Sequence, residues 1–476
     1  MSGGGVAALR SRLGIVAERD FGMLWTGRVL SLLGDYAFRI ALITYLITET
    51  GSPWSLAVAG AVLTLPSLVF YLYGGAVGDT ADSRRRIMAA ADVGRFAAAG
   101  AITVAVLLSA HPAVVVVLAL LLGVGEGFFM PASFALLTEI VRKDRLVAAN
   151  SANSVGQQIA LITGPMLGGL LIGALGAAAA FGFNALTFLA SAVCILAIRS
   201  ARSRRAQGAG PAVPADAGAS GADTAESTAE SATGDATGDA GGDGDGGPRK
   251  VLADIAGGFG YVLGHRWLVV AFAVGMLANA VFTGSLDVTV PFVLSPGGVE
   301  EAADLGGFYA LEGAGALLGA LILVRLTVVR VGTGMFAMLA MMAASLLMVG
   351  VFGDHPGAFA MAVVYGVGLH FFNSLFPSLL QAKVPEHLMS RVGSIVFLAF
   401  NGLMPLGTLV MGPAVDAFGP LAVLMASGGA VAVMCAAAAL LPSIRALRMD
   451  DGSGGGEESG QEGGASPSSA SEEATG

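Results

Sequence analysis

The chain has 476 residues, of which 55% are hydrophobic and only 12% are charged. Soluble domains carry roughly twice that share of charged residues, so this composition argues against a water-soluble fold. The 70 glycines suit membrane helices, in which small residues let backbones approach closely. At roughly 20 apolar residues per span, the chain has room for about a dozen membrane helices.

The net charge of −9 is unevenly distributed. The segment 206–248 and the residues from 446 onward hold 15 of the 34 acidic residues but one of the 25 basic residues. The rest of the chain is therefore net positive. Both acidic segments consist mainly of small and polar residues, which bury too little apolar surface to offset the entropy of ordering. We predict that both are disordered.

Twelve apolar segments, six on each side of the acidic linker, predict an all-α membrane protein. The spans are expected at 21–48, 54–78, 86–109, 112–137, 148–174, 177–198, 268–294, 304–325, 332–352, 356–380, 391–415 and 419–441. The organisation predicted from them is an N-terminal segment (1–20), a six-helix bundle (21–198), a disordered linker (199–250), an amphipathic surface helix (251–267), a second six-helix bundle (268–441) and a disordered tail (442–476).

Basic residues mark one side of the membrane. Of the 25 Lys and Arg residues, 22 fall at the termini, in alternate loops or in the central segment. The positive-inside rule then predicts that both termini and the linker are cytoplasmic, as in a multi-pass protein of a bacterial inner membrane. The other three basic residues, Arg28, Arg39 and Arg95, lie inside predicted spans.

An internal repeat relates the two groups of spans. Residues 128–141 align with residues 371–384 at a constant offset of 243, and the offset also pairs Ser151 with Ser394. Two related halves of six helices suit a protein in which one half rocks against the other.

The loop after the second span carries a recognisable motif. Residues 75–85 have the sequence GAVGDTADSRR. This resembles the major facilitator superfamily signature G-x-x-x-D-x-x-G-R-R/K-R/K, with Asp82 in place of the usual Gly and Ser83 in place of a base. The resemblance implies gating roles for Gly75, Asp79, Arg84 and Arg85, with Asp79 near the start of the eleventh span.

A second motif lies in the fifth predicted span. Residues 160–169, ALITGPMLGG, resemble the G-x-x-x-G-P-x-x-G-G motif of drug and proton antiporters, with Ala160 in place of the first Gly. The resemblance implies export, whereas a Pro-kinked and closely packed membrane helix is the structural alternative. The matching positions are Gly164, Pro165, Gly168 and Gly169. The chain also resembles bacterial siderophore exporters and macrolide efflux proteins in two residue pairs, Asp92 with Arg95 and Gly412 with Asp416.

Carboxylates inside the spans are candidates for proton coupling. An ionisable group at membrane depth costs on the order of 3 kcal/mol, so each needs a partner or a function. Glu126 has no base one turn away on its helix, and neither do Asp287 and Glu312. Glu126 is therefore the first candidate for carrying a proton, because burial penalises its charged form. Asp35 is a weaker candidate, since Arg39 lies one turn along the same face.

Two further groups of charges and side chains complete the expected site. Asp92 and Arg95 are spaced i, i+3, and we expect a structural ion pair with the nearby loop charges. By the resemblance, the first, fourth, seventh and tenth spans line a central cavity, which would place Asp35, Glu126, Asp287 and His370 around one pocket. Its expected aromatic and mildly polar wall consists of Phe129, Asn279, Phe371, Phe372 and Asn373.

These features together indicate a secondary transporter that exports amphipathic small molecules in exchange for protons. Proton-coupled import of a small metabolite is the alternative, and a membrane scaffold or receptor is a further one. An enzyme is not expected, because no H-E-x-x-H motif occurs. No Walker loop, cofactor site, metal site or nucleic-acid partner is indicated, and we expect a monomer that works with its substrate, protons and lipid.

The first prediction concerns the linker. Deletion of most of residues 206–248, with Arg202–Arg205 and Arg249 retained, should leave membrane insertion and transport unchanged, because a disordered segment contributes no packing. Membrane yield and transport rate of the deletion variant test this. A variant that fails to fold would show that the segment packs or binds.

Overall fold

The computed structural model describes residues 14–77, 81–142, 145–199, 260–326, 330–353 and 355–448. Regular structure within these residues is helical throughout. The predicted linker lies outside them apart from residue 199. Of the predicted surface helix at 251–267, residues 260–264 are helical and the part before residue 260 lies outside. The predicted tail begins with a short helix, α18 (Pro442–Arg445), and lies outside the described residues from residue 449.

The first half contains six long helices after the short 3-10 turn η1 (Gly14–Ala17). They are α2 (Arg19–Thr50), α3 (Pro53–Val77), α4 (Ala81–Leu107), α5 (Pro112–Ile140), α6 (Leu146–Leu175) and α7 (Ala177–Leu196). The break between α2 and α3 follows from the sequence Gly-Ser-Pro. Gly51 has a φ of 58° and donates its N–H to the Ile47 carbonyl at 2.9 Å, while Pro53 occupies the first position of α3.

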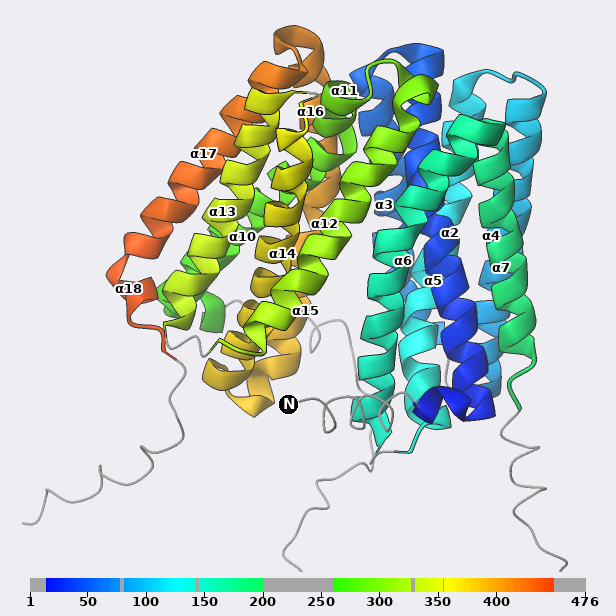
Figure 1. Ribbon diagram of the computed structural model, residues 1–476. Coiled ribbons are helices and arrows are strands. Elements are labelled where there is room, and N and C mark those ends of the chain that lie inside the picture. The colour runs from blue at the N-terminus through cyan, green and yellow to red at the C-terminus, as the bar shows by residue number, and fades with distance from the viewer. Residues whose placement is uncertain are drawn as a thin grey trace, which may run out of the picture.

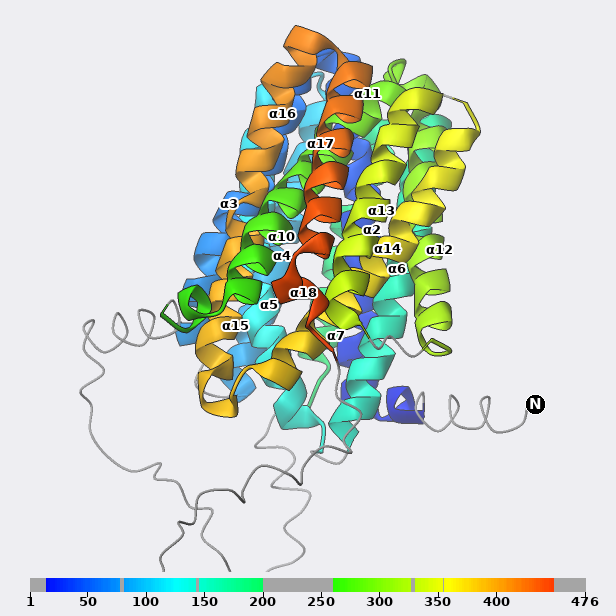
Figure 2. The same cartoon turned by 90° about the vertical axis from the view of Figure 1, so that its left-hand side faces the viewer.

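The second half follows the same plan with more interruptions. Its elements are α10 (Arg266–Gly284), the π-helical turn η3 (Ser285–Thr289), α11 (Val290–Leu294), the 3-10 turn η4 (Gly298–Glu301), α12 (Ala302–Leu323), α13 (Val331–Phe352), α14 (Gly357–Lys383), α15 (Glu386–Gly402), α16 (Met404–Phe418) and α17 (Pro420–Leu440). Figure 2 shows this half in front, with α17 between α16 and α13.

The membrane fold expected from composition is confirmed. Eleven helical stretches in the described part of the chain are long and apolar enough to cross a membrane. The remaining expected span, at 391–415, is broken at Leu403 into α15 and α16, each shorter than a full span. Pro405 explains the break, because it lacks the N–H that would bond to the carbonyl four residues earlier.

The bundle exposes apolar side chains on its outer surface and buries a few charged ones in its otherwise apolar core. Large apolar side chains such as Val117, Leu186 and Val433 are exposed on the outside of the helices, whereas Asp92, Arg95 and Glu312 are buried. An apolar outer surface, with the charged groups kept inside the bundle, suits a hydrocarbon surrounding.

The two halves converge at one end of the molecule. We call the end at which α2 begins the near end, and the opposite end, which holds Gly51 and η4, the far end. Figure 1 shows the helices of the two halves coming together at the far end and diverging toward the near end. At the far end the Val299 N–H donates to the Thr48 hydroxyl at 3.2 Å, and Gly412 of α16 faces the Trp54 backbone of α3.

The glycine motif of α6 forms part of this far-end contact. Gly168 packs on the Ala37 backbone of α2, while Gly169 packs on α12, where an added Cβ would lie 2.6 Å from the Ala302 carbonyl oxygen. A Cβ on Gly306 of α12 would in turn lie 2.6 Å from the Pro165 oxygen. The motif therefore lets α6 approach both its own half and the other half closely.

A pair of matched glycines tests this contact. Gly169→Ala should separate α6 from α12 and destabilise the closed far end by about 1–3 kcal/mol, because the added methyl meets backbone. Hydrogen–deuterium exchange at residues 298–305 should then rise. Gly173→Ala, one turn later on α6 with nothing within 4 Å of the added Cβ, is the control. Equal exchange in the two variants would contradict the assignment.

Candidate functional site

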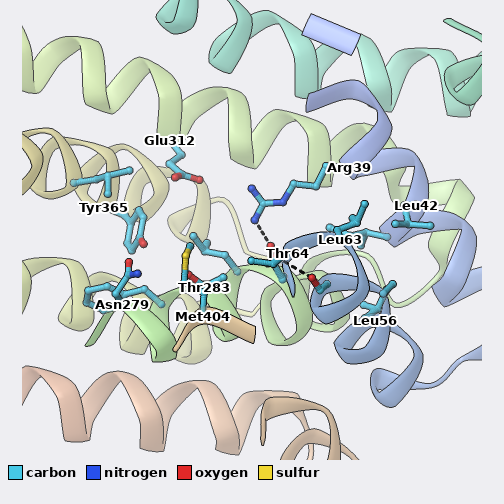
Figure 3. A pocket seen from close by; sticks show the side chains of 17 residues that line it. Arg39, Leu42, Leu56, Leu63, Thr64, Asn279, Thr283, Glu312, Tyr365 and Met404 are labelled. Carbon is cyan, nitrogen blue, oxygen red and sulfur yellow. Dashed lines mark hydrogen bonds and ion pairs between the residues drawn. The ribbon is translucent and has the colours of Figure 1, made fainter. Parts of the chain in front are cut away.

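A cavity of about 400 Å³, here named the central cavity, lies between the two halves. Its walls come from α2 and α3 on one side and from α10, η3, α12, α14 and α16 on the other. Most lining side chains are apolar, and the charged ones are Arg39, Asp287 and Glu312 (Figure 3). An apolar wall with a few placed polar groups is typical of small-molecule binding sites.

An ion pair crosses this cavity from one half to the other. Arg39 of α2 pairs with Asp287 of η3, and its guanidinium lies 5.4 Å from the centre of the Tyr309 ring. Asp287 occupies a π-helical turn, a geometry common at functional sites. Pro291 disturbs the helix there, because it cannot donate to the Asp287 carbonyl.

This contact corrects an expectation from sequence. Arg39 was expected to pair with Asp35 one turn away on the same helix, but it pairs with Asp287, 248 residues along the chain. Spacing along a helix identifies only local partners. The carboxylate of the other half faces Arg39 across the central cavity, whereas Asp35 lies 3.8 Å from Arg95.

Glu312 of α12 also lines the central cavity. The residue is 7% exposed, and no hydrogen bond or ion pair within 4.0 Å involves it among the described residues. Arg39 attracts it electrostatically but is already paired with Asp287. Figure 3 shows the Glu312 carboxylate directed into the space between Arg39 and Tyr365.

A second cavity of about 320 Å³, the first-half cavity, adjoins the central one and shares Arg39, Leu63 and Thr64 with it. Its charged lining comes from Asp35, Arg39, Arg95 and Glu126.

Arg95 is the centre of the charges in the first half. Its side chain, 2% exposed, forms an ion pair with Asp92, lies 2.7 Å from Glu126 and 3.8 Å from Asp35. The guanidinium also lies 4.6 Å from the Phe129 ring centre and 4.4 Å from that of Phe188. One cation therefore holds three carboxylates from three helices.

The contacts of Arg95 correct two expectations from the sequence. Asp92 and Arg95 do form an ion pair, but Arg95 points into the bundle rather than to loop charges. Glu126, which lacks a local base, receives one from α4. Helical spacing predicts the Asp92–Arg95 pair within α4, whereas the contact of Arg95 with Glu126 depends on how α4 packs against α5.

A third cavity of about 240 Å³, the second-half pocket, opens beside the central cavity. Asn279 lines both and donates to the Phe400 carbonyl at 2.8 Å. Asn373 and Phe372, expected in the wall of the central cavity, line the second-half pocket instead.

Three residues expected in the cavity wall lie elsewhere. Phe129 is buried against Arg95, and Phe371 is buried in the helix core of the second half. His370 contacts Ser374 at 3.3 Å and faces Gly319 of α12. Residues spaced one apart point in different directions on a helix, so only part of the run from 370 to 373 can face one cavity.

Sequence analysis did not identify Tyr365 and Phe400 as lining residues. Both border the second-half pocket, and Tyr365 also borders the central cavity. The only available signal was their position on predicted spans, which most phenylalanines and tyrosines of the chain share.

Of the four residues with a predicted gating role, three lie in the described part of the chain. Asp79 lies outside the described residues, and Gly75 lies in the last turns of α3. Arg84 pairs with Glu139 at the end of α5, and Arg85 donates to the Ile198 carbonyl at 2.5 Å. Both arginines thus join helix ends at the near end, and their gating role stays a prediction. No group of three potential metal ligands occurs in the described part of the chain.

The family model described as Major Facilitator Superfamily matches residues 24–408. The multidrug efflux pump Tap of Mycolicibacterium fortuitum is 26% identical over 412 residues, covering 84% of this chain and 90% of Tap. The macrolide efflux protein A of Streptococcus pyogenes is 30% identical over 154 residues, covering 32% of this chain. That match spans only 37% of the streptococcal protein.

Solved structures with the same fold include the nucleoside transporter NupG, with a TM-score of 0.64, 13% identity and coverage of 88% of this chain and 98% of NupG. A bacterial homologue of the iron transporter ferroportin, solved in an inward-facing state, gives a TM-score of 0.59 at 14% identity over 89% of this chain and 99% of that one. At such identities the likeness concerns the fold alone.

The cluster around Arg95 leads to a stability prediction. Arg95→Met should lower the stability of the folded protein by about 3–5 kcal/mol, because it leaves three carboxylates without their cation. Arg28→Met is the control, since Arg28 contacts Ser133 and the Phe134 ring but no carboxylate within 4.0 Å among the described residues. Thermal unfolding of both purified variants measures the difference, and similar losses would refute the central role of Arg95.

Proposed function

The chain belongs to the Major Facilitator Superfamily, and on that premise we propose that it works by alternating access and exports amphipathic small molecules in exchange for protons. That it is a multi-pass membrane transporter follows from the family and the fold. The observation that carries the proposal is the central cavity between the two halves, joined to a cluster of carboxylates around the buried Arg95 in the first half.

The contacts between the halves support alternating access. The close contacts between α6 and α12 and between α3 and α16 involve small residues, which can separate without exposing large apolar side chains. The Arg39–Asp287 pair is one further link to break. Rocking about the central cavity would open the far end and close the near end.

The cavity lining supports an amphipathic substrate. The central cavity combines leucine, isoleucine and phenylalanine side chains with Thr64, Asn279 and Thr283. Macrolide efflux protein A, the Tap multidrug efflux pump and the lysophospholipid transporter LplT of Salmonella heidelberg bear names that fit such a substrate.

The direction of transport rests on two further arguments. The glycine motif of α6 resembles antiporters, and two relatives are named as efflux proteins. By the positive-inside rule, the arginine-rich loops favour a cytoplasmic near end, and the described conformation would then be open to substrate from inside.

Flux measurements in vesicles of defined orientation test the proposal. Proteoliposomes with an imposed pH gradient should move a macrolide such as erythromycin against the proton flow. Movement in the same direction as the protons would establish import instead. Transport of neither kind, with pure and folded protein, would leave the scaffold or receptor alternative.

Glu126 is the first candidate for the coupling proton. Glu126→Gln mimics the protonated acid permanently, so it should abolish proton-driven export while substrate binding or downhill exchange persists. Glu49→Gln, an exposed carboxylate at the end of α2, should leave the rate unchanged. Full gradient-dependent export by Glu126→Gln would move the coupling site to Asp35, Asp287 or Glu312.

A further inference from the structure

The three adjoining cavities differ in how their charges are matched. In the first-half cavity, Asp35 and Glu126 both lie within 4.0 Å of Arg95. In the central cavity, Asp287 has Arg39, whereas no cation is within 4.0 Å of Glu312 among the described residues. The described residues that line the second-half pocket include no Asp, Glu, Lys, Arg or His. Among the described residues, two carboxyl groups and one guanidinium therefore line the central cavity.

An unmatched carboxylate in such surroundings calls for a counter-charge. Removing a charge from water without a partner costs several kcal/mol, and Glu312 is 93% buried between helices of a membrane bundle. Its carboxylate nevertheless faces a cavity large enough for a ligand. A cation brought by the ligand would satisfy Glu312.

The second-half pocket is placed to take the apolar body of that ligand. It shares Asn279, Phe282, Tyr365, Leu369 and Met404 with the central cavity, so the two spaces are adjacent.

Aromatic rings form much of the wall of this pocket. Phe372 and Phe400 have ring centres 6.1 Å apart, and Phe376 stacks on Phe372 behind them at 5.6 Å. The absence of a side chain at Gly275 makes room for the Phe400 ring, because a Cβ at residue 275 would lie 2.7 Å from that ring. Aromatic faces of this kind bind flat apolar groups and attract cations.

We propose that Glu312 and the second-half pocket together bind a lipophilic monocation, with the cationic group at Glu312 and the apolar body against the Phe372 and Phe400 rings. The inference rests on the proposed function, because it names the substrate class of the same transporter. The proposal also assigns different roles to the two halves. The first half holds the proton-carrying carboxylates, and the second half binds the substrate.

Two probes of equal shape and opposite charge test the proposal. Tetraphenylphosphonium and tetraphenylborate are titrated onto the purified full-length chain in lipid nanodiscs, with empty nanodiscs as the blank. We expect the phosphonium to bind at least tenfold more tightly than the borate. Glu312→Gln should weaken phosphonium binding tenfold or more without weakening borate binding, whereas Phe400→Ala should weaken both.

Two variants of α12 serve as controls. Glu312→Asp keeps the charge and should keep the preference for the cation. Asp304→Asn removes an exposed carboxylate two turns away on the same helix and should change phosphonium affinity less than twofold. Thermal unfolding of each variant verifies that it is folded.

The proposal fails if the two probes bind equally, or if folded Glu312→Gln binds phosphonium as the wild-type chain does. Because binding is measured without a proton gradient, this failure is distinct from failure of the proposed export. Selective phosphonium binding without proton-driven flux would overturn the export mechanism alone. Proton-driven export of neutral molecules with equal probe binding would overturn the substrate class alone.

Discussion

The cost of placing charges inside a membrane bundle dominates this structure. Arg95 is buried in the first half and Arg39 lines the central cavity inside the bundle, and each is held by a carboxylate from another helix. Arg95 joins α2, α4 and α5 within one half, while Arg39 joins α2 to η3 across the two halves. The first contact stabilises a half, whereas the second stabilises one arrangement of the two halves. A transporter needs the former to persist and the latter to break.

Close packing of small residues provides the second constraint. At the far end, Gly169 and Gly306 bring α6 and α12 within backbone contact, and Gly412 does the same for α16 against α3. Such contacts are specific in geometry yet bury little apolar surface per residue. Their loss on opening is therefore modest in free energy, which suits a switch between two conformations.

The two halves share a helical plan but differ in what they place around the centre. The first half contributes Asp35, Arg39, Arg95 and Glu126. The second half contributes Asp287 and Glu312 together with Tyr365, Phe372, Phe400 and three asparagines, Asn279, Asn373 and Asn401. Although the two halves are related by a sequence repeat, they line the cavities with side chains of different chemistry. The interruptions in the second half, at η3 and at Leu403, also fall beside the cavities, where Asp287 and Met404 line the wall.

Composition, span length and the loop motif were sufficient to predict the membrane fold and the family, because hydrophobic length and turn residues act locally along the chain. The same local signals located Asp35, Glu126, Asp287 and Glu312 as unusual charges. Their partners depended on the packing of helices far apart in sequence, as with Arg39 and Asp287 or Arg95 and Glu126. Which face of α14 lines a cavity, Phe372 rather than Phe371, likewise followed from helix rotation in the bundle. The sequence by itself determined which helices form, and only the tertiary structure decided which charges meet, because an ion pair depends on distance in space.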